Sequence, residues 1–285
     1  MTLPVPTLAD ALPGYPALTL GTMLMPAQQT IATLHQAIAL GYRAFDAAPI
    51  YGNEHAVGEA LRTAPIPREE LFVTTKLWNS SHRYDDALAA FDRTAGRLGL
   101  ETVDLYLIHW PVPTRGHYVE AWKALVRLKE EGRVRAIGVS NFLPEHLDRI
   151  IDATGVVPAA NQIEINPSHQ QAALRAANFE RGIVSQAWSP FGNGGSLADP
   201  ALAALAARLG CTPGQAVLRW HLQSGVHPVV KASSPAHLAE NLAASFAAFD
   251  AADLAAMTAL DRGASCFGLD PHTFEAPAGY EDYCP

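Results

Sequence analysis

Paired cysteines, clusters of basic residues and long apolar stretches are all missing from this sequence. Its three cysteines, Cys211, Cys266 and Cys284, are widely spaced, and none forms a CxxC pair. An odd and sparse set of this kind is typical of a reducing cytoplasm rather than of a disulfide framework. We therefore expect free thiols, and we expect no metal site.

Positive charge is scarce as well. The chain has 20 Lys and Arg residues against 28 Asp and Glu residues, which gives a net charge of −8. This balance argues against nucleic acid or an anionic membrane surface as the main partner. The first basic residue is Arg43, so we expect no secretory signal, and no apolar run approaches the ~18 residues of a membrane span. These absences predict a cytoplasmic protein, which we expect to be a monomer, acting on a small molecule.

Eight short apolar runs alternate with helix-like segments along the sequence. Apolar residues make up 49% of the chain and charged residues 17%, which allows a large core and argues against disorder. Helical periodicity lies between the apolar runs, as in Ile31, Leu34 and Ile38 before Gly41. The runs that we expect to form strands are 18–24, 43–47, 71–77, 103–108, 134–139, 159–163, 183–187 and 226–230.

Strands that alternate with helices predict a parallel sheet, and eight such units fit a closed α/β barrel of the (β/α)8 or TIM type. An open doubly wound sheet is the alternative, although no GxGxxG follows the first expected strand. No linker or repeat divides the chain, so we expect one domain over residues 1–285. Residues 1–17 should form an N-terminal turn or hairpin that covers one barrel end, and residues 266–285 a short C-terminal tail.

Polar residues, together with one tryptophan, stand at the ends of nearly all the expected strands. They are Thr22, Asp46, Lys76, His109, Ser140, Asn141, Gln162, Trp188 and Lys231. Catalytic groups of an α/β barrel lie at these C-terminal strand ends, because the loops converge there over the barrel mouth. Packing does not explain so many polar groups at an apolar barrel end, so the pattern predicts a catalytic and binding site.

Four residues of this set, or just beyond it, suggest acid–base chemistry. Tyr51 lies five residues after Asp46, in the loop that follows the second expected strand. A phenol is a weak acid with a pKa near ~10, and a neighbouring ammonium such as that of Lys76 lowers this pKa. Asp46 should hold and neutralise the lysine, and His109 on the next strand should orient a carbonyl oxygen. We predict that Tyr51 is a general acid.

Five segments resemble the aldo-keto reductase family and follow the family's order between about residues 18 and 262. They are Asp46–Glu54 (DAAPIYGNE), Thr75–Trp78 (TKLW), Leu107–Pro111 (LIHWP), Gly138–Phe142 (GVSNF) and Asn161–Glu164 (NQIE). The likeness is greatest to short prokaryotic members such as 2,5-diketo-D-gluconate reductase. It implies an oxidoreductase that reduces aldehydes or ketones to alcohols by hydride transfer from a nicotinamide cofactor. Its implied catalytic tetrad is Asp46, Tyr51, Lys76 and His109.

The resemblance also implies a site for NADPH. Lys231 and the helix start at Ser234-Pro235 would bind the 2′-phosphate, because a helix N-terminus attracts anions. Many members carry an arginine where this chain has His237, and a histidine holds a phosphate less firmly than a guanidinium does. We therefore expect NADPH to be preferred and NADH to be accepted. The implied cofactor residues are Thr22, Ser140, Asn141, Gln162, Trp188, Ser189, Phe191, Gly192, Lys231, Ser233, His237, Glu240 and Asn241.

Met23, Trp78 and Trp110 match positions that line the family's substrate pocket. The tail, with its aromatic residues Phe267, Phe274 and Tyr280, should cover the pocket mouth and shape specificity. Small aldehydes, α-keto compounds and diketones all remain as substrates at this stage.

Two other functions fit an α/β barrel. A nucleotide-binding module without catalysis would have no need of Lys76 beside Tyr51. A phosphate-binding isomerase would need a carboxylate base and a phosphate site near the last two strands, and Trp188 at a strand end suits it poorly.

Overall fold

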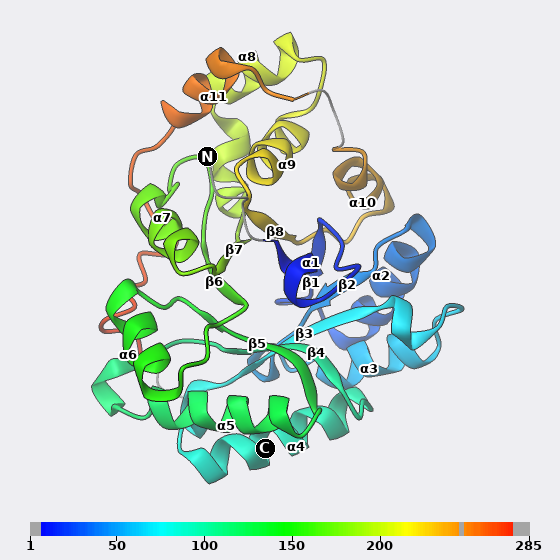
Figure 1. The fold of residues 1–285 in the computed structure, drawn as a ribbon. Coiled ribbons are helices and arrows are strands. Elements are labelled where there is room, and N and C mark those ends of the chain that lie inside the picture. The colour runs from blue at the N-terminus through cyan, green and yellow to red at the C-terminus, as the bar shows by residue number, and fades with distance from the viewer. Residues whose placement is uncertain (1–6, 245–247, 276–285) are drawn as a thin grey trace.

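Eight parallel strands close into a barrel in chain order in the computed structural model, which describes residues 7–244 and 248–275 (Figure 1). The first strand pairs with the last, Thr19 opposite Val229, and this pairing completes the closed sheet. The strands are β1 (Thr19–Gly21), β2 (Ala44–Asp46), β3 (Phe72–Leu77), β4 (Val103–Ile108), β5 (Val134–Ser140), β6 (Ala160–Glu164), β7 (Val184–Trp188) and β8 (His227–Val230).

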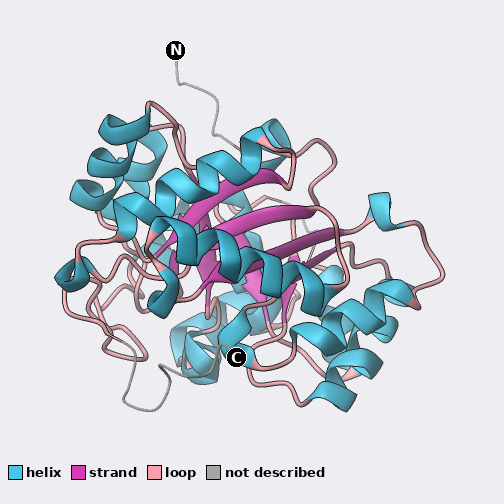
Figure 2. Cartoon of the chain, turned by 90° about the horizontal axis from the view of Figure 1, so that it is seen from below, coloured by secondary structure: helices cyan, strands magenta, loops and turns pink. Residues whose placement is uncertain are grey.

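Helices surround the strands, as Figure 2 shows from a second direction. In α2 the buried residues include Leu34, Ala37 and Ile38, and the helix ends at Gly41, whose φ of 112° is left-handed. The helices are α1 (Leu8–Ala11), α2 (Ala27–Leu40), α3 (Glu54–Arg62), α4 (Tyr84–Leu98), α5 (Tyr118–Glu130), α6 (Pro144–Thr154), α7 (Ala172–Glu180), α8 (Pro200–Arg208), α9 (Pro213–Gln223), α10 (Pro235–Leu242) and α11 (Ala251–Thr258).

The barrel that the sequence predicts is confirmed, and the open sheet is excluded. The expected strand 103–108 is β4 without any change of bounds, and six others agree to within one residue at each end. The expected strand 18–24 is wrong in its second half, because β1 ends at Gly21. The chain turns at once, with Met25 N–H donating to the Thr22 carbonyl at 3.1 Å.

The N-terminal end of the barrel is closed by the segment before β1. Leu8, Leu12 and Tyr15 are buried there against barrel residues such as Phe72 and Leu105, and Figure 1 shows α1 lying across the strands. The segment covers a barrel end as predicted. Of the two forms expected, a turn or a hairpin, residues 8–11 make a helical turn, and residues 1–6 lie outside the described part of the chain.

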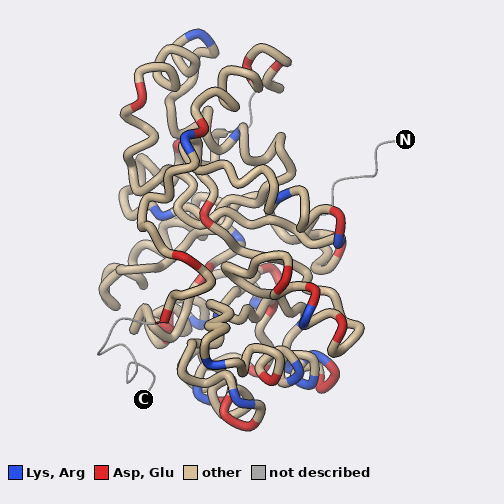
Figure 3. The backbone as a smooth tube through the Cα atoms, turned by 90° about the vertical axis from the view of Figure 1, so that its left-hand side faces the viewer, with Lys and Arg blue, Asp and Glu red and all other residues tan. Residues whose placement is uncertain are grey.

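Two features of the described residues bear on partners. No single helix among them is both long and apolar enough to cross a membrane. Only α8 and α9 taken together pass on length and composition, and they bend by 83° at the break between them. Figure 3 shows acidic and basic residues interspersed along the chain.

Candidate active site

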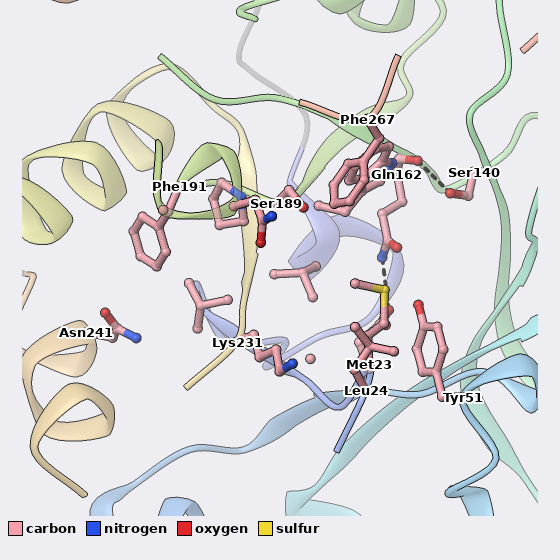
Figure 4. A pocket seen from close by; sticks show the side chains of 18 of the residues that line it. Met23, Leu24, Tyr51, Ser140, Gln162, Ser189, Phe191, Lys231, Asn241 and Phe267 are labelled. Atoms are coloured by element: carbon pink, nitrogen blue, oxygen red, sulfur yellow. Dashed lines mark hydrogen bonds between the residues drawn. The ribbon is translucent and has the colours of Figure 1, made fainter. Parts of the chain in front are cut away.

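A cavity of about 910 Å³ opens at the C-terminal ends of the strands. Most of the residues that the sequence predicts for the site line it, and Figure 4 shows several of them around the same space. They are Met23, Asp46, Tyr51, Trp78, His109, Trp110, Ser140, Asn141, Gln162, Trp188, Ser189, Phe191, Lys231, His237, Glu240 and Asn241.

Four predicted residues do not line the cavity: Thr22, Lys76, Gly192 and Ser233. Thr22 is buried, and its hydroxyl donates to the Asp46 carbonyl at 3.0 Å, so the side chain is used to join two loops. Lys76 is fully buried and contacts Asp46 and Tyr51, which do line the cavity.

The floor of the cavity carries a buried lysine between a carboxylate and a phenol. The Nζ atom of Lys76 lies 2.5 Å from Asp46 Oδ1, 3.0 Å from the Ala47 carbonyl oxygen and 3.4 Å from Tyr51 Oη. Strand pairing brings Asp46 and Lys76 together, because β2 ends at Asp46 beside β3. The turn Pro49–Tyr51 then folds the chain back, so that the phenol of Tyr51 lies above the lysine. Three residues that are not adjacent in the sequence thereby form one group that contains a carboxylate, an ammonium and a phenol.

Burial and charge act in opposite directions on this group. Burial is the largest effect on Tyr51 and raises the pKa of its phenol, while Lys76 lowers it and Asp46 raises it. Burial lowers the pKa of Lys76, but the charges of Asp46 and Tyr51 raise it, and the net result is a raised pKa. The expectation that Lys76 lowers the pKa of Tyr51 is confirmed, and the larger effect of burial outweighs it. Tyr51 is a protonated phenol at neutral pH, which is the form a proton donor needs.

His109 stands beside Tyr51 at the end of β4. The two rings meet edge to face with centroids 6.1 Å apart, and the Trp78 ring lies 5.1 Å away on another side. Burial, and then the charge of Lys76, hold the pKa of His109 well below its usual value. The imidazole is thus neutral, and it can donate one hydrogen bond to a substrate oxygen without adding charge to the cavity.

Amides and an indole form a linked group at the ends of β5, β6 and β7. Trp188 Nε1–H donates to Asn141 Oδ1 at 2.8 Å, and Asn141 Nδ2–H donates to the His109 carbonyl at 3.0 Å. Gln162 Nε2–H donates to Asp46 Oδ2 at 2.9 Å, and the Ser140 hydroxyl donates to the Gln162 carbonyl at 2.7 Å. Polar side chains therefore surround the tetrad and orient one another, a suitable surface for a planar amide.

The far end of the cavity can bind an anion. Lys231 follows β8, and α10 begins four residues later with Ser234 as its N-cap, whose hydroxyl accepts from the His237 N–H at 3.2 Å. Among the described residues that line the cavity, Lys231 is the only lysine or arginine. His237 is exposed on the first turn of α10. The Glu240 carboxylate accepts a hydrogen bond from the Thr212 hydroxyl at 2.5 Å, which ties α10 to the start of α9.

A loop with unusual backbone follows β7. Ser189 and Asn193 have left-handed φ angles of 47° and 53°. Gly192 is left-handed as well, and a Cβ atom there would lie 2.6 Å from Ser196 Oγ, so only glycine fits. Ser189, Phe191 and Asn193 line the cavity, which is consistent with a loop that wraps a bound group.

The C-terminal tail crosses the cavity mouth, as predicted. Phe267 lies 5.7 Å from the Trp188 ring, and Phe274 lies 4.1 Å from the Trp110 ring, centroid to centroid. Tyr280 lies outside the described residues. The anchor of this tail was not predicted: the buried Glu164 carboxylate accepts from the Ser265 hydroxyl and the Cys266 N–H, both at 2.7 Å.

Leu24 and Leu269 also line the cavity without having been predicted. Leu24 belongs to a segment that the sequence assigns to a strand, and Leu269 lies in the tail with no local pattern to mark it.

Comparison with known proteins identifies the family of the chain. Residues 17–262 match the family described as "Aldo/keto reductase family". The chain is 43% identical over 265 residues to an aldo-keto reductase of Mycolicibacterium smegmatis, covering 92% of this chain and 94% of the relative. It is 42% identical over 261 residues to the methylglyoxal reductase DkgA of Escherichia coli (strain K12), covering 91% and 94%.

Solved structures give the same result. A mutant of Gox0644 in complex with NADPH superposes with a TM-score of 0.87 at 45% sequence identity, covering 91% of this chain and 94% of the other. The two chains are therefore similar in both sequence and fold over nearly their whole lengths. The chain belongs to the aldo/keto reductase family.

Proposed function

We propose that this chain is a single-domain enzyme that reduces aldehydes or ketones to alcohols with NADPH, and that Asp46, Tyr51, Lys76 and His109 are its catalytic residues. The observation that carries the proposal is the buried Lys76 ammonium, held at 2.5 Å by Asp46 Oδ1 and 3.4 Å from Tyr51 Oη. A structural ion pair needs no phenol beside it at the floor of a cavity, whereas proton donation to a carbonyl does.

The cavity is suited to a dinucleotide. It has an anion-binding end at Lys231 and α10, the left-handed loop after β7, and polar side chains beside the tetrad at Asn141 and Gln162. Trp188 lines the same cavity and would offer a flat ring to the nicotinamide. The complex of the Gox0644 mutant with NADPH supports the same cofactor here. When bound, NADPH supplies the hydride that the carbonyl carbon accepts.

The protein's own residues handle the proton. The substrate oxygen accepts hydrogen bonds from the Tyr51 hydroxyl and from neutral His109, which together orient the carbonyl. As negative charge develops on that oxygen, the Tyr51 hydroxyl transfers its proton and becomes a phenolate. The Lys76 ammonium 3.4 Å away stabilises this phenolate, and Asp46 fixes the ammonium in place.

The cofactor end suggests how strongly NADPH is preferred over NADH. Lys231 and the first turn of α10 favour a 2′-phosphate. His237 cannot form the bidentate, permanently charged contact of an arginine. We infer that NADPH is preferred by a modest factor and that NADH is used.

The test is NADPH oxidation by the purified chain with a panel of aldehydes, ketones and dicarbonyls. Methylglyoxal belongs in it because a relative 42% identical is a methylglyoxal reductase. Carbonyl-dependent oxidation supports the proposal, and its absence with every compound contradicts it. The expectation of a cytoplasmic monomer stays a prediction, which light scattering coupled to size exclusion tests for the oligomeric state.

A further inference from the structure

Two histidines and a glutamate come together where the C-terminal tail passes the start of α6. His272 Nε2 lies 3.5 Å from Glu145 Oε1, and one ligand atom from each of Glu145, His146 and His272 lies within 4.8 Å of the other two. Figure 1 shows the end of the tail, in red, next to α6. Among the described residues this is the one group of three or more histidine, cysteine, aspartate or glutamate side chains with such spacing.

His146 is held in place by the residues around it. The residue is 3% exposed, and its ring meets the rings of Tyr118 and Phe142 edge to face, with centroids 5.5 Å and 5.9 Å apart. Leu143 N–H also donates to its Nδ1 atom at 3.2 Å. A metal ion at Nε2 places the ring proton on Nδ1 and breaks this long hydrogen bond, a loss smaller than the gain from a metal–imidazole bond. The ring is thus a ligand with little freedom left to lose.

The tail presents His272 from a short turn. His272 N–H donates to Asp270 Oδ1 at 2.9 Å, and Phe274 N–H donates to the Asp270 carbonyl at 2.8 Å. Beyond the turn, Phe274 packs on Trp110 with centroids 4.1 Å apart. The His272 side chain itself is 56% exposed, so it can rotate toward an ion without disturbing the core.

The donor atoms indicate which ion the group would bind. Two imidazoles and one carboxylate favour a first-row ion such as Zn²⁺, whereas Mg²⁺ and Ca²⁺ prefer oxygen ligands. Ligand atoms at about 2.1 Å from a tetrahedral zinc ion lie about 3.4 Å from one another. The 3.5 Å between His272 and Glu145 matches this spacing, and rotation of these two exposed side chains closes the wider gaps. The Glu145 carboxylate also supplies negative charge at the electropositive start of α6.

We propose that Glu145, His146 and His272 bind a zinc ion, with water at the fourth position, and that the ion joins the C-terminal tail to α6. The ion would fix the segment just before Phe274, which contacts Trp110 at the cavity. The sequence analysis expects no metal site, because His272 is far from the other two ligands along the chain and no local motif marks them. The inference goes beyond the proposed function and does not depend on it, since none of the three ligands lines the cavity.

The first test is calorimetric titration of the full chain with ZnCl₂ after removal of bound metal by a chelator. We expect one zinc ion to bind with a micromolar Kd, and His272→Gln to weaken this binding by about ten-fold or more. His55→Gln is the matched control, because His55 is exposed on α3 and belongs to no such group among the described residues. Equal zinc affinity in His272→Gln and the parent, or an equal loss in His55→Gln, overturns the site.

Cobalt(II) distinguishes this site from one made by the thiols of Cys211 or Cys266. Cobalt bound by imidazole and carboxylate absorbs in the visible range without a thiolate charge-transfer band in the near ultraviolet. We expect the parent to give the visible bands alone, and His272→Gln to lose them. A thiolate band that persists in His272→Gln would assign the ion to a cysteine and overturn the proposal.

The second test concerns the link between the tail and α6. Zinc should slow cleavage of the tail by a serine protease about three-fold or more in the parent, because the bound ion stabilises the docked tail. It should have little effect in Glu145→Gln, which lacks the anionic ligand. An equal cleavage rate with and without zinc in the parent contradicts the link. Neither test uses the carbonyl reaction, so its outcome is separate from that of the proposed function.

Discussion

The contact between Lys76 and Tyr51 gives a quantitative prediction for Lys76→Met. The ammonium lies 3.4 Å from the phenol oxygen. At that separation and an effective dielectric constant of about 20, the attraction between ammonium and phenolate is roughly 5 kcal/mol. Asp46, which is bound to the same ammonium, repels the phenolate and cancels part of this. A net loss of roughly 3–4 kcal/mol corresponds to a kcat lower by about 10² to 10³.

The pH profile of Lys76→Met should change together with the rate. Carbonyl reduction needs protonated Tyr51, so activity is present below the pKa of the phenol and is lost as pH rises through it. Burial already raises this pKa and Lys76 alone among its charged neighbours lowers it. Its removal therefore moves the alkaline limit of kcat to higher pH.

Steady-state kinetics across pH, with cofactor affinity measured by NADPH fluorescence, checks both effects of Lys76→Met. The substitution also leaves the buried Asp46 carboxylate without its ammonium, so we expect a lower Tm. Lys123→Met at an exposed position of α5 is the control. A Lys76→Met enzyme with the kcat and pH profile of the parent would contradict the role assigned to the Lys76 ammonium.

Three other substitutions test separate parts of the site. His109→Gln keeps a hydrogen-bond donor and should lower kcat/KM by about 10- to 100-fold without moving the alkaline limit of kcat; an altered limit would assign the titration to His109. His237→Arg should raise the ratio of NADPH to NADH affinity by about ten-fold in fluorescence titrations, and an unchanged ratio means that this side chain does not reach the 2′-phosphate. Glu164→Gln weakens the bonds that hold the tail at Ser265 and Cys266, so KM should rise several-fold and limited proteolysis should cut the tail faster; equal cleavage rates would show that Glu164 is no anchor.

The regular parts of the fold could be predicted because their signals are local. Strand β4 has all six residues buried and five of the six are apolar, which is typical of a parallel strand covered on both faces. Leu24 could not be placed in this way. Its apolar neighbours suggest a strand, but the turn depends on the Asn53 amide, which comes about thirty residues later in the chain.

The members of the tetrad could be named from strand ends and family resemblance, whereas their energetics could not. The sequence places a cation near Tyr51 but does not tell how completely the phenol is buried, and burial is the larger effect on its pKa. The anchor at Glu164 was missed for another reason: it binds Ser265 and Cys266, about a hundred residues further along the chain, and no local pattern records such a contact.

The most direct test of the account is the turnover of Tyr51→Phe. Phenylalanine keeps the ring beside His109 and removes the hydroxyl proton that Tyr51 is proposed to transfer to the substrate oxygen. We predict that kcat for aldehyde reduction falls by at least ~10² while the Kd for NADPH stays close to that of the parent. A Tyr51→Phe enzyme that turns over at the parent rate would contradict the assignment of Tyr51 as the general acid.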